Sequence, residues 1–294
     1  MKGFFRKNGP GYIFLTPWFI GFFCLTIGPI LISLYLAFTQ YDIVNPPKWV
    51  GLENFMFMLR YDDRFLQSMK VTFSYVFLSV PCKLIVSLAV AMVLDKGIRA
   101  IGFYRALFYL PSILGGSIAV AILWRQLFNH DGIINTILSH MGITGPYWLN
   151  DPDYSLYTLV ALSMWQFGSP MLIFLAGLRA IPKELYEAAQ IDGAGRLRKI
   201  RHVSLPGILP IIITMLLLNL GRLMTVGFEK VFLLYNTATY ETADVISTYV
   251  YRSGLIAQQY SFAAAVGLFN SVVTLVLLTM FNAIARRLSE YSLW

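Results

Sequence analysis

Residues 71–94 read VTFSYVFLSVPCKLIVSLAVAMVL, and Lys83 is the only charged side chain in this stretch of 24 residues. A helix of about 20 mainly apolar residues crosses the hydrocarbon core of a bilayer. The run is too continuous for the alternating pattern of a membrane-spanning β-strand. It therefore predicts a transmembrane helix and decides the fold class of the chain.

The composition of the 294 residues agrees with a membrane protein. Hydrophobic residues make up 57% of the chain and charged residues 13%, with a mean hydropathy of +0.64. Soluble domains carry roughly 25% charged residues. The two cysteines, Cys24 and Cys82, lie in apolar runs, which excludes a disulfide framework and a cysteine-based zinc site.

Apolar stretches of similar length recur along the whole chain. We expect an all-α integral membrane protein in which residues 1–294 form a single transmembrane domain. Small residues at Gly115, Gly116 and Ser117 are interpreted as close helix packing within the third span. The six predicted spans cover residues 12–39, 71–94, 103–128, 155–178, 207–234 and 261–285.

Basic residues predict how these spans run through the membrane. Fourteen Lys and Arg residues fall on the side of the two termini, and five fall on the other side. Because Lys and Arg concentrate in cytoplasmic loops, both termini are expected to be cytoplasmic. The net charge of +8 is thus interpreted as a signal of topology and not of a nucleic-acid partner.

One cytoplasmic loop differs from the others. Residues 179–206 read RAIPKELYEAAQIDGAGRLRKIRHVSLP. Pro182 suits the first turn of a helix, and Gly193 and Gly195 can end one, so we predict a short helix from about 183 to 191 with Leu185 and Ile191 as apolar anchors. A second, basic segment follows at 196–202. From charge alone, an ordinary positive-inside loop remains an equal alternative.

The residues of this loop also carry a family resemblance. Glu187-Ala188-Ala189, then Gly193, then Val203-Ser204-Leu205-Pro206 resembles the EAA motif of permease subunits of binding-protein-dependent ABC importers. Gly51-Leu52-Glu53-Asn54-Phe55 and Tyr104 to Pro111 resemble the carbohydrate branch, of the maltose and glycerol-phosphate type. The resemblance implies the type I ABC importer permease fold.

The same resemblance implies a function and partners. The chain is expected to be a pore-forming subunit that moves a sugar or oligosaccharide across the bacterial inner membrane by alternating access. A homologous second permease, two ATP-binding subunits that carry ATP and Mg, and a solute-binding protein would complete the importer. The residues expected to couple to the ATPase are Glu187, Ala188, Ala189, Asp192 and Gly193.

Sequence signatures of chemistry are missing from the chain. It contains no Gly-x-x-x-x-Gly-Lys-Ser/Thr loop for ATP, no His-Glu-x-x-His metal motif and no Gly-x-Ser-x-Gly nucleophile turn. We therefore expect no catalytic residues, no metal ligands and no cofactor in this chain.

Charged and polar side chains within the spans predict a solute pathway. Arg222 lies about 16 residues past Pro206, which is about 24 Å along a helix and within the bilayer. The resemblance implies that the helices on either side of the EAA loop line the solute site. The residues expected there are Trp165, Gln166 and Ser169 in the fourth span and Asn219, Arg222, Leu223 and Val226 in the fifth.

An arginine at membrane depth favours an anionic solute, such as a uronate oligosaccharide or a glycerol phosphate. Pairing of Arg222 with Glu229, or with a carboxylate of a partner subunit, is an equal alternative. Arg125 and Lys230 are expected to extend to the outer interface, and the role of Lys83 stays open.

Two other functions compete with an ATP-driven importer. An ion-driven secondary transporter usually needs carboxylates within the membrane, and Glu229 is the sole candidate in the sequence. An intramembrane enzyme would need Ser/His or Asp pairs, which the spans do not contain.

Overall fold

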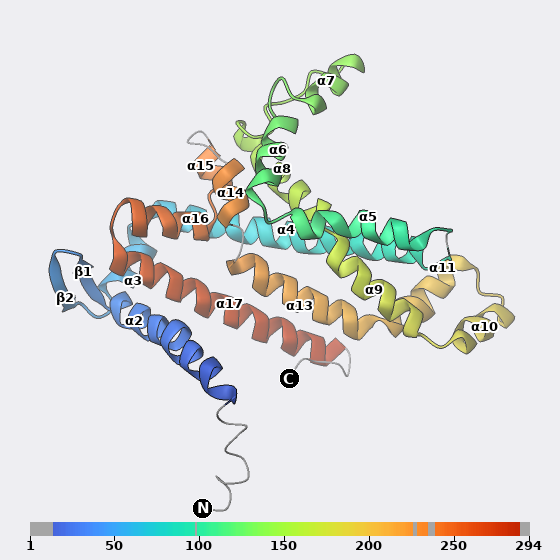
Figure 1. Ribbon diagram of the computed structural model, residues 1–294, viewed down its shortest axis with the longest axis horizontal. Helices are drawn as coiled ribbons and strands as arrows, with labels where there is room; N and C mark the ends of the chain where they lie inside the picture. Colours follow the sequence, from blue (N-terminus) through green and yellow to red (C-terminus); the bar gives the residue numbers. More distant parts are fainter. Residues whose placement is uncertain (1–13, 98, 226–227, 235–238, 289–294) are drawn as a thin grey trace, which may run out of the picture. The chain divides into compact units, whose positions relative to one another are not determined.

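The computed structural model describes residues 14–97, 99–225, 228–234 and 239–288. Their contacts divide the chain into two compact units. The first unit comprises Met1–Asp63 and Val250–Asn270, and the second comprises Arg64–Tyr249 and Ser271–Trp294. Figure 1 shows that helices dominate both.

The first unit joins an apolar helix to a small β-hairpin. Residues Phe14–Ala37 form one helix that ends in a π-helical turn, Phe23–Ile27, and α2, Gly28–Ala37. The antiparallel strands β1, Thr39–Asp42, and β2, Asn45–Trp49, follow. The short helix α3, Glu53–Arg60, comes next, and the Asn54 amide donates hydrogen bonds to the carbonyls of Ala37 and Thr39 at 2.9 Å each. These bonds fasten α3 to the start of the hairpin.

The hairpin was not expected from the sequence. Asp42 and Asn45 close its turn, because Asp42 accepts hydrogen bonds from the Asn45 backbone amide at 2.7 Å and side-chain amide at 3.0 Å. Proline removes a ladder donor and is tolerated at a sheet edge. Pro46 and Pro47 therefore fit a ladder of two strands, in which both strands are edges.

The second unit contains most of the remaining helices, whereas the π-helical turn Arg252–Ile256 and residues 260–270 of the last helix belong to the first unit. Its core is apolar and is built from α4, α8, α9 and α13, with Phe174, Met171 and Leu162 among its fully buried side chains. The helices from α4 onward are α4 Asp63–Leu94, α5 Ile101–Leu114, α6 Ile118–Leu127, α7 Ile133–His140, α8 Pro152–Trp165, α9 Gly168–Ala180, α10 Lys183–Ile191, α11 Arg196–Lys199, α12 Leu205–Gly207, α13 Leu209–Thr225, α14 Phe228–Leu234, α15 Tyr240–Ala243, α16 Ile246–Tyr251 and α17 Tyr260–Leu288. Two π-helical turns, Ile200–Ser204 and Arg252–Ile256, complete the described helices.

The described helices account for up to six membrane crossings. Three single helices are long and apolar enough to span a bilayer: Phe14–Ala37, Asp63–Leu94 and Tyr260–Arg287. Three bent pairs meet the same test together, with bends of 101° between α5 and α6, 46° between α8 and α9, and 65° between Arg196–Gly207 and Leu209–Arg222. This arrangement agrees with the predicted all-α membrane fold, but half of the crossings are broken helices.

The sharpest break lies where small-residue helix packing was predicted. α5 ends at Leu114, and the Ser117 hydroxyl accepts a hydrogen bond from the Val120 amide to begin α6 in a new direction. Gly115 and Ser117 therefore lie at a break in the third span and not inside one continuous helix. The predicted close packing is confirmed at Gly115, because a Cβ there would lie 2.3 Å from the Gln166 side chain.

Candidate functional site

The loop between α9 and α13 forms two helices separated by a glycine turn. α10 covers Lys183–Ile191, which confirms the predicted helix, and Pro182 occupies its N-cap. α11 and the π-helical turn Ile200–Ser204 form the basic segment that returns to the membrane. α10 and α11 lie together at one end of the second unit (Figure 1).

The end of α10 is capped by backbone hydrogen bonds. The Gly193 amide donates to the Gln190 carbonyl at 3.1 Å, and the Ala194 amide donates to the Ala189 carbonyl at 2.8 Å. This pair of bonds is the Schellman motif, which needs a left-handed residue just after the helix. Gly193 supplies it with φ of +74°. The predicted role of Gly193 as the turn residue is confirmed.

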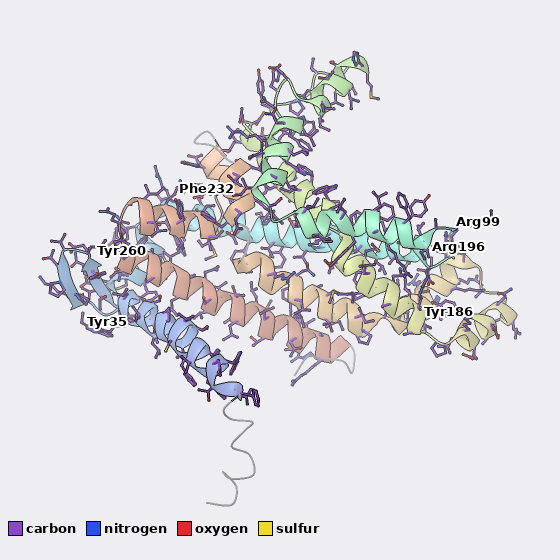
Figure 2. All side chains as sticks on the ribbon, viewed as in Figure 1. Tyr35, Arg99, Tyr186, Arg196, Phe232 and Tyr260 are labelled. Atoms are coloured by element: carbon purple, nitrogen blue, oxygen red, sulfur yellow. The ribbon has the colours of Figure 1, made fainter. Side chains whose placement is uncertain are left out.

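Two further contacts hold the loop to the unit. The Tyr186 hydroxyl forms a 3.0 Å hydrogen bond with the Ser204 hydroxyl, and Arg179 pairs with Asp95 at 3.6 Å. Figure 2 shows Tyr186 and Arg196 at this end of the second unit.

Many side chains of the loop are exposed to solvent. Glu187, Ala188 and Asp192 are exposed, and Ala189 is half-buried. The apolar side chain of Ile191 is 87% exposed, and that of Leu185 is also exposed. An exposed apolar side chain beside small and acidic residues is a surface that another protein can cover.

The predicted solute residues of the fourth span gather at the break between α8 and α9. Gln166 occupies the break and is only 7% exposed. Its amide donates to the Gly115 carbonyl at 2.9 Å, and its side-chain oxygen accepts from the Lys230 ammonium at 2.5 Å. Trp165 is half-buried and packs at a tilt against Trp124.

Ser169 belongs to the same region through its backbone. Its amide donates to the Ser112 hydroxyl at 3.0 Å, and that hydroxyl donates to the Gln166 carbonyl at 3.1 Å. A Cβ at Gly168 would lie 2.3 Å from the Phe108 carbonyl oxygen, so the glycine lets α9 touch α5. This contact positions both Gln166 and Ser169.

Lys230 does not extend outward as expected, because its ammonium is bound to Gln166 inside the second unit. Its charge interacts with that of Lys83, and Lys83 in turn interacts with Arg222. Glu229, which is exposed, places one negative charge near Lys230. The structure thus brings three cations from α4, α13 and α14 into one region. We call Lys83, Arg222 and Lys230 the intramembrane cation cluster.

The fifth-span residues are only partly brought into this region. Arg222 is exposed on α13, whereas the Asn219 amide donates to the Met215 carbonyl of its own helix at 2.8 Å. Leu223 lies in α13, but its side chain is not among those described, and Val226 lies outside the described residues.

Lys230, Ser112 and Gly115 were missed as site residues by the sequence reasoning, which left the role of Lys83 open. Charge at membrane depth was a signal for the two lysines. Nothing in the sequence indicated that Ser112 and Gly115 would face the helix break at Gln166. Among the described residues, no group of three or more His, Cys, Asp or Glu side chains is placed to hold a metal ion.

Comparison with known proteins agrees with this arrangement. A probable ABC transporter permease protein of Bacillus subtilis, YesP, is 49% identical over 208 residues, which cover 70% of this chain and 67% of the relative. The polygalacturonan/rhamnogalacturonan transport system permease protein YteP of the same organism is 30% identical over 96% of this chain and 89% of its own length.

Solved structures of bacterial alginate ABC transporters share the fold. One transporter, involved in the import of the acidic polysaccharide alginate, matches with a TM-score of 0.86 and 32% identity over 97% of this chain and 98% of that one. A second, in complex with an alginate pentasaccharide-bound periplasmic protein, matches with a TM-score of 0.87 and 31% identity over 100% and 99%.

The family of inner membrane components of binding-protein-dependent transport systems matches residues 55–290, which include every helix from α4 to α17. The broken spans, the capped loop and these similarities lead to one conclusion: the chain is a multi-pass inner-membrane protein that belongs to this family of transport permeases.

Proposed function

We propose that this chain lines the pathway of an ATP-driven importer and that its solute is an oligosaccharide bearing carboxylates. The observation that carries the proposal is the intramembrane cation cluster. Placing charge at membrane depth costs free energy, so such residues generally mark a pathway for a solute or ion. Among the described charges that act on Lys83 and Lys230, Glu229 supplies the one carboxylate and the others are cations, which suits an anion.

The residues around the cluster suit a sugar. Gln166 supplies an amide and Trp165 an aromatic face, and binding sites for small molecules combine apolar walls with a few fixed polar groups. Ser169 lies in the first turn of α9, just after the same break. The relatives support an acidic sugar, since one is a permease for polygalacturonan and rhamnogalacturonan and another belongs to an importer of the acidic polysaccharide alginate.

The chain would work as one part of an assembly. Its partners would be a homologous permease, two ATP-binding subunits and a solute-binding protein, and the alginate transporter solved with its periplasmic protein supports the last of these. ATP and Mg would bind to the ATPase subunits, and this chain would perform no covalent chemistry. Both termini would be cytoplasmic, with α10 facing the ATPase and residues 1–294 forming one transmembrane domain.

Within α10, Glu187 would contact the ATPase directly, while Ala188 and Ala189 would permit close approach. Asp192 and Gly193 would complete the contact by setting the turn. The exposure of Glu187, Ala188 and Asp192 supports this role.

Uptake into proteoliposomes tests the solute. We expect the complete transporter, with its binding protein and internal ATP, to import trigalacturonate. Lys230→Gln and Arg222→Gln each remove a cation of the cluster and should lower that uptake by about ten- to a hundredfold, because a hydrogen bond to a charged group contributes roughly 1.5–3 kcal/mol. The matched control is Arg60→Gln on the exposed surface of α3. Import of maltotriose but not trigalacturonate would refute an anionic solute.

Co-purification tests the ATPase contact. We expect Glu187→Lys to lose the ATP-binding subunits, whereas Glu184→Lys, which reverses another exposed charge in the first turn of α10, should keep them. Uptake that proceeds without ATP and responds to an ion gradient would indicate a secondary transporter instead.

A further inference from the structure

A polar cavity that shares no lining residue with the cation cluster lies beside the segment that connects α6 to α8. Its volume is about 350 Å³, at the small end of the range of ligand sites. α14 packs against both α6 and α8 (Figure 1), and Leu234, the last residue of α14, closes one side of the cavity.

The walls of the cavity combine amides with aromatic rings. Gln126, Asn129 and Asn150 supply amide groups, and His130 and Tyr147 supply an aromatic wall. The rings of His130 and Tyr147 stack in parallel, with centroids 4.1 Å apart. Amides that bind hydroxyl groups beside a flat aromatic face are the chemistry that a sugar ring requires.

The permanent charge of the cavity is positive. Arg125 lines it, and none of the described lining residues carries a carboxylate. Asp151 lies next to Asn150 in sequence, but its carboxylate caps the start of α8 by accepting from the Asp153 amide at 2.9 Å. A guanidinium recognises a carboxylate with two parallel hydrogen bonds, so the cavity favours an acidic sugar.

The cavity is held in shape by a buried side chain beside it. Asn135, only 8% exposed, donates hydrogen bonds to the carbonyls of His130 and Pro146 and accepts one from the Trp148 indole at 2.7 Å. A Cβ at Gly145 would lie 2.0 Å from the Asn135 oxygen, so glycine is required for this close approach. These bonds join the two chain segments that carry His130 and Tyr147, so the aromatic wall of the cavity is formed before any ligand binds.

We propose that this cavity is an outer subsite that binds the acidic end of an oligosaccharide before it reaches the cation cluster. The proposal rests on the proposed function, because the orientation of the chain places the α6–α8 connection on the outer side. Arg125 holds a carboxylate of the terminal sugar, Asn129 and Gln126 bind its hydroxyl groups, and Tyr147 covers one face of its ring. The small volume fits the end of an oligosaccharide and not the whole chain.

Cysteine protection tests the subsite in the complete transporter. Asn150→Cys, at a lining residue to which the proposal assigns no contact with the sugar, is made in a chain whose Cys24 and Cys82 are replaced by alanine. Its reaction with a membrane-impermeant maleimide is timed from the outer side. We expect trigalacturonate at twice its dissociation constant to slow labelling about threefold by mass action. Maltotriose should not slow it. Met141→Cys, at the exposed end of α7 and outside the cavity, is the matched control.

Adding Arg125→Gln to the reporter chain should abolish the protection. Absence of protection, equal protection by maltotriose, or protection that survives Arg125→Gln would each overturn the proposal. Slower labelling caused by the sugar-free binding protein would overturn it too, because the cavity would then be a protein-docking surface. Failure of the proposed function is seen separately, as a wild-type transporter that imports no trigalacturonate.

Discussion

Replacing Gly193 by alanine should weaken the end of α10 by an amount that follows from one backbone angle. Gly193 has φ of +74°, and a Cβ there would meet nothing within 4 Å. The substitution therefore adds no steric clash with neighbouring residues. What remains is the conformational cost of a left-handed L-residue, roughly 1–2 kcal/mol.

That cost acts on the two hydrogen bonds of the cap. The Ala194 amide, bound to the Ala189 carbonyl at 2.8 Å, is freed when the cap opens. A cost of about 1–2 kcal/mol changes the ratio of capped to open loop by a factor of about 5–30. Hydrogen exchange of the Ala194 amide should become faster by the same factor, because exchange of a native amide follows local opening.

Gly195 offers a matched control two residues away. Its backbone is extended, with φ of −65° and ψ of 173°, and a Cβ there also meets nothing within 4 Å. Alanine adopts this conformation without strain, so Gly195→Ala should leave exchange at Ala194 unchanged or slower. If the loop contacts the ATPase, retention of the ATP-binding subunits should fall for Gly193→Ala and not for Gly195→Ala.

Two results would refute the reasoning. Equal exchange in Gly193→Ala and wild type would mean that the left-handed angle does not limit the cap. Equal acceleration in both glycine variants would mean that any side chain in the turn disturbs it, whatever its backbone angle.

Three further predictions concern other parts of the chain. Gly168→Ala should lower the free energy of unfolding by about 1–3 kcal/mol, because the new Cβ would lie 2.3 Å from the backbone of α5. Gly102→Ala has open space around its new Cβ and should not lower it, and thermal unfolding in detergent measures both variants. Asn135→Ala should lower the free energy of unfolding by about 1–3 kcal/mol and speed proteolysis of residues 128–150. An unchanged proteolysis rate would contradict the view that the hydrogen bonds of Asn135 hold this segment together. Hydrogen bonds from Asn45 hold the pKa of the Asp42 carboxyl below its ordinary value. The charged form therefore stabilises the hairpin above a pH of about 4, and this stability is lost as the pH falls through the lowered pKa. Protection of the Asn45 amide from hydrogen exchange, corrected for the intrinsic rate, should be higher at pH 5 than at pH 3, and equal protection would contradict the prediction.

Local sequence preferences were enough to predict the helix of the loop. The bounds of α10 agree with the predicted 183–191 because Pro182 and Gly193 act through their own backbone angles. The hairpin at 39–49 was missed, because the pairing of its two short polar strands depends on a turn that leaves no signal in the hydropathy pattern.

The solute region shows the opposite case. Gln166 was predicted to line the pathway, but its two partners were not, because Gly115 and Lys230 are distant in sequence and meet it only through helix packing. Lys230 was expected to extend to the interface, since periodicity gives the face of a helix and not what lies across from it. The grouping of Lys83 with Arg222 and Lys230 could not be predicted for the same reason.

The sequence by itself thus determined the membrane class, the crossings and the capped loop, because hydropathy and backbone preference act over a few neighbouring residues. Only the tertiary structure decided that three crossings are bent, that Gln166 joins the end of α5 to α14, and that a polar cavity forms beside the α6–α8 connection. These features arise from contacts between helices far apart in the chain, where the close approach at Gly115 and Gly168 sets which side chains meet.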